Sequence, residues 1–298
     1  MRFGDRRTSD NVESQRGQSF GGGGGGGLGG GAGMLLGLVA NRFGIGGVVV
    51  LLIIFAIFGG LGNLTGGGGQ QAVAPTQNNG QASGDVCQSD PVTRFSCQVL
   101  GSTEDRWSEI FTANGQRYVA PKMIVYDRRG SSGCGAADSA MGPFYCPADQ
   151  GIYLDTQFFR ELDQRFQAPG DFAQAYVIAH EVGHHVQTIT GTSDRIRRAQ
   201  QAVGQTEGNA LQVRMELQAD CYAGLWAARE RVALEQGDME EGMRAASAIG
   251  DDTLQRAEQG RVVPESFTHG TAAQRQEALM RGFRGGDPSA CDSYTQGI

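Results

Sequence analysis

The sequence predicts an α+β domain whose strands come early and whose helices come late, preceded by one transmembrane helix. Three observations lead to this prediction: an uncharged apolar run over residues 43–62, short strand-like segments between residues 122 and 155, and helical periodicity from residue 156 onward. The chain has 298 residues, so the part that follows the apolar run is long enough for one sizeable core.

The first 42 residues predict a disordered leader. About half of the 48 glycines of the chain lie before residue 85, and a glycine tract at residues 21–33 cannot bury apolar area. The basic residues that precede the apolar run all lie in this leader, at Arg2, Arg6, Arg7, Arg16 and Arg42.

Residues 43–62 contain no charged side chain over about 20 residues, the length that spans a hydrocarbon core. A buried core helix or a cleaved signal peptide would be the alternatives. Residues 63–84 form an uncharged Gly/Gln/Asn-rich linker, so the arginines lie only on the N-terminal side. The positive-inside rule then predicts a single-pass protein of the inner membrane, with a cytoplasmic N-terminus and with residues 85–298 periplasmic or extracellular.

The cysteines agree with export. All six lie beyond the linker, and an even number of cysteines outside the cytoplasm indicates disulfides. Paired C-x-x-C spacing, which a cysteine metal site would need, is absent. Among the possible pairings, we expect two short closures and one long one: Cys87 with Cys97, Cys134 with Cys146, and Cys221 with Cys291.

Within residues 85–298 the expected elements follow from periodicity and turn residues. A helix should begin at Ser102 or Thr103 and end before Gly115. We expect a strand at 122–127, a hairpin from 142–146 and 151–155, and helices at 156–166, 171–187, 207–232, 239–259 and 271–283. The net charge is -7 and no basic stripe is present, which argues against a nucleic-acid surface.

The chemistry lies in His180-Glu181-Val182-Gly183-His184, an H-E-x-x-H motif inside a predicted helix. Residues four apart face the same way, so His180 and His184 can bind one zinc ion while Glu181 addresses the zinc-bound water. Gly183 would be tolerated inside the helix if another backbone passes close to it. His185 points about 100° away from His184, which predicts a structural histidine that bonds a backbone carbonyl.

A catalytic zinc needs a third protein ligand. The metzincin pattern is excluded because Gln187 and Thr190 stand at the positions it would require. Glu216 is the favoured ligand, since Asp220 lies one turn later and could hydrogen-bond the far nitrogen of a ligand histidine. Asp194 is the alternative ligand, although it could equally cap the next helix.

These motifs, together with RRTSDNVESQRG near the N-terminus, CGAADSAMGPFYCPADQGIYLD and SFTHGTAAQR, resemble the bacterial neutral zinc metallopeptidase family over the whole chain. The family is similar to gluzincins, in which a glutamate of E-x-x-x-D completes H-E-x-x-H. The resemblance implies a zincin-like fold, one Zn²⁺ per chain held by His180, His184 and Glu216, Glu181 as general base, and Asp220 as the partner of a ligand histidine.

The stretch Thr268-His269-Gly270, with Arg275 after it, is similar to a Thr-His-Pro stretch followed by arginine that approaches the active site in related membrane peptidases. In that reading His269 stabilises the oxyanion and Arg275 orients substrate or a carboxylate. A histidine at a helix start with no catalytic role is the alternative.

The predicted activity is hydrolysis of peptide bonds in a peptide or protein of the cell envelope, with the substrate extended along an edge strand near residues 142–146. Two other functions fit the same motifs: a non-catalytic, zinc-stabilised envelope interaction module, and a zinc amidase acting on cell-wall peptides.

Overall fold

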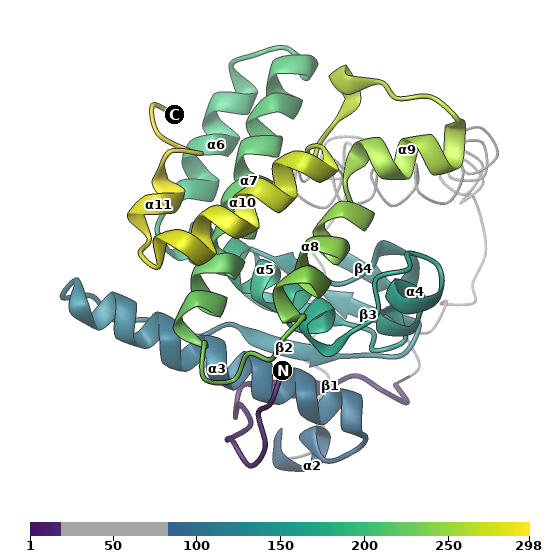
Figure 1. Ribbon diagram of the computed structural model, residues 1–298, viewed down its shortest axis with the longest axis vertical. Coiled ribbons are helices and arrows are strands. Elements are labelled where there is room, and N and C mark those ends of the chain that lie inside the picture. Colours follow the sequence, from purple (N-terminus) through teal and green to yellow (C-terminus); the bar gives the residue numbers. More distant parts are fainter. Residues whose placement is uncertain (19–82) are drawn as a thin grey trace, which may run out of the picture.

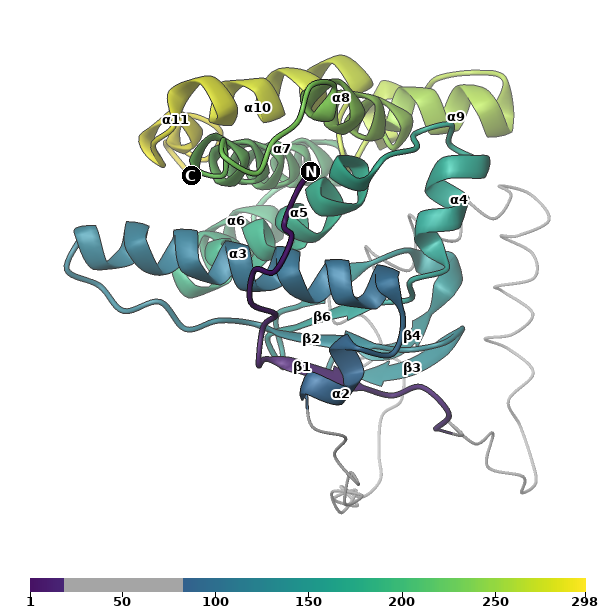
Figure 2. The ribbon, with the colours of Figure 1, turned by 60° about the horizontal axis from the view of Figure 1, so that its bottom comes forward.

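The computed structural model describes residues 1–18 and 83–298, and it places a four-stranded sheet beneath layers of helices (Figure 1). Figure 2 shows the sheet at one side of the molecule, α3 and α5 above it, and α7, α8 and α10 farther out. The described chain is therefore mixed in secondary structure and mostly helical, as the sequence predicted.

The sheet has the order β1-β2-β6-β5, with bounds Val12–Ser14, Lys122–Val125, Gly151–Leu154 and Phe144–Cys146. β1 and β6 both run parallel to β2, while β5 pairs antiparallel with β6 and forms an edge. The predicted strand at 122–127 and the hairpin after it are confirmed. A second sheet, formed by β3 (Arg129–Ser132) and β4 (Gly135–Asp138), was not predicted.

The helices are α2 (Ser83–Cys87), α3 (Pro91–Ala113), α4 (Phe158–Gln164), α5 (Asp171–Ile189), α6 (Thr192–Gln201), α7 (Gln205–Arg229), α8 (Asp238–Ala248), α9 (Asp251–Gln259), α10 (Ala272–Gly285) and α11 (Ser289–Asp292). Most lie where periodicity predicted a helix. α3 begins far earlier than predicted, because the Asp90 side chain caps it by accepting from the Thr93 amide.

Residues 1–18, which we call the N-terminal arm, pack against the rest of the domain (Figure 2). Phe3 and Val12 are 5% and 2% exposed and belong to the main hydrophobic core. The prediction of a disordered leader is therefore wrong for residues 1–18. The prediction failed because the few apolar side chains of the arm are buried against α3 and β2, which lie far away in the sequence.

The three predicted disulfides are confirmed. They join Cys87 to Cys97, Cys134 to Cys146, and Cys221 to Cys291. The last of these ties α7 to α11 across a sequence separation of 70 residues. Such a long closure restricts the unfolded chain more than the two short ones do.

The predicted transmembrane helix at 43–62 lies outside the described residues, as do the rest of the leader and nearly all of the linker. Within residues 1–18 and 83–298, no helix combines the length and the apolar character that crossing a bilayer requires.

The contact between Asp90 and the arm predicts that the stability of the fold decreases in acid. Burial opposes the charge on Asp90, but hydrogen bonds from Thr93 and Arg16 lower its pKa from 3.8 to about 2. A carboxyl group whose pKa is lower in the folded protein stabilises the fold at pH values above its ordinary pKa of 3.8. This contribution is lost as the pH falls toward 2. The stability difference between wild type and Asp90→Asn should therefore shrink between pH 4 and pH 2, as measured by urea unfolding. A difference that is constant with pH would contradict this expectation.

Candidate metal centre

The site forms where α5 and α7 come into backbone contact. A Cβ atom added at Gly183 would lie 3.0 Å from both Cα and the carbonyl oxygen of Ala219, so any larger side chain would push the helices apart. This confirms the expectation that a second backbone passes close to Gly183. The approach brings His180 and His184 of α5 against Glu216 of α7.

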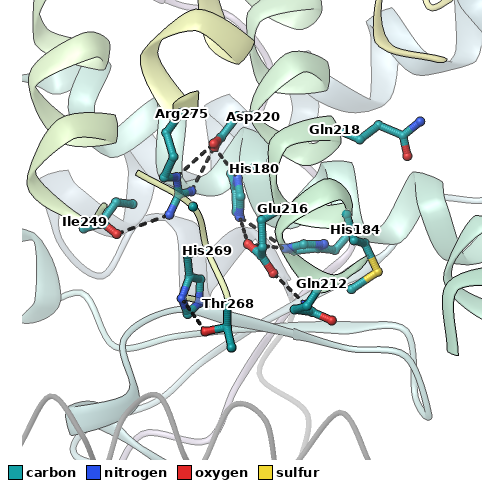
Figure 3. Close-up of polar contacts among 12 residues, drawn as sticks. His180, His184, Gln212, Glu216, Gln218, Asp220, Ile249, Thr268, His269 and Arg275 are labelled. Carbon is teal, nitrogen blue, oxygen red and sulfur yellow. Dashed lines mark hydrogen bonds and ion pairs between the residues drawn. The ribbon is translucent and has the colours of Figure 1, made fainter. Parts of the chain in front are cut away.

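The ligand atoms of these three residues form a nearly regular triangle (Figure 3). Nε2 of His180 lies 3.1 Å from Nε2 of His184, and Oε2 of Glu216 lies 3.2 Å and 3.4 Å from these two nitrogens. Ligands of a tetrahedral zinc ion at its usual bond lengths are about 3.3 Å apart. The donor set and its spacing therefore fit Zn²⁺, with a fourth position left for water or substrate.

Each of these ligands is held from its other side. Nδ1 of His180 lies 2.8 Å from Asp220 Oδ1, and Nδ1 of His184 lies 2.9 Å from Gln187 Oε1. Because each Nδ1 donates to an oxygen, Nε2 is the nitrogen that is left to bind a metal, in place of a proton. Oε1 of Glu216 accepts from Gln212 at 3.0 Å, which directs Oε2 toward the two histidines.

Gln187 acts as an orienting residue that sequence reasoning missed, since it was considered only as a failed metal ligand. Its amide nitrogen donates to the Met215 carbonyl at 2.7 Å and to Gln218 Oε1 at 3.1 Å. With the amide nitrogen fixed on α7, the oxygen must face His184. The available signal was the spacing of three from His184 to Gln187 on one helix face.

Asp220 is completely buried and joins three helices. Besides His180, it accepts from the Tyr176 hydroxyl at 2.5 Å and from the Arg275 Nε and Nη2 atoms at 2.8 and 2.9 Å. Burial alone would raise the pKa of Asp220, but Arg275 and His180 lower it to about 2. Burial likewise opposes the charge on His180, yet Asp220 and Glu216 raise its pKa to about 10.

Arg275 is 2% exposed, and its guanidinium donates hydrogen bonds to Asp220 and Tyr176. Of the two roles expected for Arg275, orienting substrate or orienting a carboxylate, its contacts fit the second, because the group it orients is the Asp220 carboxylate. Its spacing after His269 indicated proximity to the site and not the direction of the side chain.

Glu181 lies beside the ligands and is buried. Its pKa is raised, mainly by burial. The backbone N–H of Tyr145 in β5 donates a hydrogen bond to it, so the sheet edge borders the site. A carboxylate with a raised pKa is a better proton acceptor than a solvated one.

His269 faces the same site from the loop before α10, beside Glu216 in Figure 3. Asp251, at the start of α9, holds this loop: its Oδ2 accepts from three consecutive backbone amides, those of Thr268, His269 and Gly270, at 2.7, 2.6 and 3.0 Å. Its Oδ1 lies 3.3 Å from His269 Nδ1. Burial opposes the charge on each partner, yet the pKa of His269 is raised and that of Asp251 is lowered by their contact. Sequence reasoning missed Asp251, which stood inside one predicted helix at 239–259.

Two further residues resolve the alternatives. Asp194 lies in the first turn of α6, exposed and paired with Arg197 at 2.6 Å, and it does not join the ligand cluster. His185 is buried, with Nε2 2.6 Å from the Val119 carbonyl oxygen, which confirms its expected structural role.

A second group of carboxylates in the described part of the chain consists of Asp171, Asp238 and Glu241. The amino group of Met1 lies 2.5 Å from Asp171 and 3.2 Å from Asp238. A cation of the chain itself therefore already balances this acidic group.

Residues 1–294 match the family described as "Putative neutral zinc metallopeptidase". The Escherichia coli K12 protein "Uncharacterized protein YpfJ" is 45% identical over 302 residues, which covers 100% of both chains. The Mycobacterium tuberculosis H37Rv protein "Uncharacterized protein Rv2575" is 42% identical over 191 residues, covering 60% of this chain and 64% of its own. No solved structure matches the chain.

The geometry predicts which carboxylate binds the metal. Glu216→Ala should weaken Zn²⁺ binding by roughly 100-fold or more, since it removes a ligand atom and not merely an orienting partner. Asp194→Ala is the matched control and should bind zinc like the wild type. Competition with a chelating dye measures both affinities, and circular dichroism checks that both variants fold. The reverse order of affinities would restore Asp194 as the ligand.

Proposed function

The chain belongs to this family of neutral zinc metallopeptidases, and from that premise we propose that it hydrolyses peptide bonds in peptides or proteins of the cell envelope. The observation that carries the proposal is the combination of a three-ligand triangle with a buried carboxylate, Glu181, directly beside it. A structural zinc site is closed by four protein ligands, whereas three ligands and an adjacent base suit a hydrolase.

Zn²⁺, when bound by His180, His184 and Glu216, would lower the pKa of water and polarise the scissile carbonyl. Glu181 then takes the proton from the attacking water and returns it to the departing amine. Its pKa is raised, mainly by burial, which makes it a better proton acceptor than a solvated carboxylate.

His269 supplies a hydrogen bond to the carbonyl oxygen as negative charge develops on it. Its Nδ1 lies among Asp251 and Thr268, and the described residues give its Nε2 no hydrogen-bond partner. Nε2 is thus the atom available to substrate. Asp251 acts as a positioning residue, since it fixes both the loop and the ring.

The substrate would extend along β5. This strand forms the edge of the sheet, and its Tyr145 amide touches Glu181, so a peptide beside β5 passes the catalytic base. We place the domain outside the cytoplasm on the strength of its three disulfides, which persist in oxidising compartments. Whether the chain is attached to a membrane is a separate prediction, because residues 43–62 lie outside the described residues.

Replacing the base tests the activity itself. In the full chain, Glu181→Gln should keep its zinc and lose about 10²–10⁴-fold in kcat/KM on a mixed peptide library, because the amide cannot take a proton. Zinc counted by mass spectrometry is the control. Stoichiometric zinc without Glu181-dependent cleavage would contradict the proposal and favour a zinc-stabilised interaction module, whereas cleavage confined to cell-wall peptides would favour the amidase.

If Asp251 acts by positioning His269, the effects on kcat of replacing the two residues should not add. Asp251→Asn should lower kcat about 10-fold or more with little change in KM, and it should have no further effect in a His269→Ala background, since it acts through that ring. Asp252→Asn is the matched control, because Asp252 accepts a backbone bond from Ala272 at 2.7 Å in the same turn. Fully additive losses would show that Asp251 acts on stability alone.

A further inference from the structure

We infer that the N-terminal arm and residues 83–298 lie on the same side of any membrane to which the chain is attached. This inference does not depend on the catalytic proposal. It rests on the contacts between the two segments, and it departs from the topology that the charge pattern predicted, in which the N-terminus is cytoplasmic and the domain is exported.

The first contacts are backbone hydrogen bonds. The Met123 amide donates to the Asn11 carbonyl at 2.8 Å, and the Gln15 amide donates to the Val125 carbonyl at 2.8 Å, so β1 completes the sheet beside β2. The Ser9 amide donates to the Cys97 carbonyl of α3 at 3.0 Å. Groups about 3 Å apart cannot be separated by a hydrocarbon core about 30 Å thick.

The second observation is that α3 is shaped to receive the arm. A Cβ atom added at Gly101 would lie 3.2 Å from the Arg7 carbonyl oxygen and from the Ser9 nitrogen. Glycine in a helix interior costs about 1 kcal/mol relative to alanine, and the passage of the arm gives this one a reason. Beside it, Glu104 of α3 accepts from the Ser9 hydroxyl at 2.5 Å and from the Asn11 side chain at 2.8 Å.

The third observation concerns the arginines of the arm. Each of the four has an acidic partner on the rest of the domain: Arg2 with Glu235, Arg6 with Glu230, Arg7 with Glu104 and Asp105, and Arg16 with Asp90 and Asp127. They are four of the five arginines from which the positive-inside rule predicted a cytoplasmic N-terminus, and the fifth, Arg42, lies outside the described residues. Ion pairing within the fold explains the placement of these four, so they are not evidence for a cytoplasmic N-terminus.

An odd number of membrane crossings between residues 18 and 83 would put the arm and the domain on opposite sides. The shared core and sheet exclude that arrangement for the folded protein.

Cysteine labelling of the full chain tests the inference. Asp10→Cys places a thiol on the exposed surface of the arm, and Val232→Cys places one at a residue that is 92% exposed on the domain. Spheroplasts are treated with a membrane-impermeant maleimide before or after lysis, with the wild type as the background control. Both thiols should react before lysis, or both only after it. Reaction of one thiol before lysis and of the other only after it would overturn the inference.

A stability measurement tests whether the arm is part of the fold. Val12→Asp puts a charge at a position that is 2% exposed and should lower the thermal midpoint of the full chain by roughly 5 °C or more. Asp10→Ala, on the exposed side of the arm, is the control and should leave the midpoint unchanged. An unchanged midpoint for Val12→Asp would show that the arm does not complete the core and would overturn the inference.

Discussion

The buried carboxylate of Asp220 is the interaction on which the site depends. It lies on α7, binds Tyr176 and His180 of α5, and receives two hydrogen bonds from Arg275 of α10. Removing one member of such a group leaves an uncompensated charge in the interior, which costs several kcal/mol. The packing of three helices and the direction of a metal ligand are thus set by the same contacts. Any change that relaxes the helix packing would also misdirect His180.

The three imidazoles of the site are oriented by chemically different partners. A carboxylate on Nδ1 raises the basicity of the ring, whereas an amide oxygen fixes the ring with less electrostatic effect. Asp220 binds His180 and Asp251 binds His269, while Gln187 binds His184. The neutral partner limits the negative charge around the metal, where Glu181 and Glu216 already lie. Burial raises the pKa of Glu181, the charge of Glu216 also raises it, and the neutral amide of Gln187 adds no further anion to this effect.

The parts of this structure that sequence predicted are those encoded by a local period or a short pattern. His180 and His184 share a face because a helix repeats every 3.6 residues, and Glu216 precedes Asp220 by one turn for the same reason. The arm was not predictable in this way, because β1 has three residues and its partner β2 lies more than a hundred residues later. Arg275 shows a related limit: its proximity to the site was readable, but the direction of its side chain depends on the packing of α10 against α7.

The arm can remain part of the domain despite the 64 residues between positions 18 and 83. These residues lengthen the connection between β1 and β2 by a factor of about 2.5. Each doubling of a connection costs only about 0.6 kcal/mol of closure entropy. Burying Phe3 and Val12 contributes about 1.5–3 kcal/mol for each side chain, before the ion pairs of the arginines are counted. The docking of the arm therefore depends on its contacts with the domain far more than on the length of sequence that separates the two.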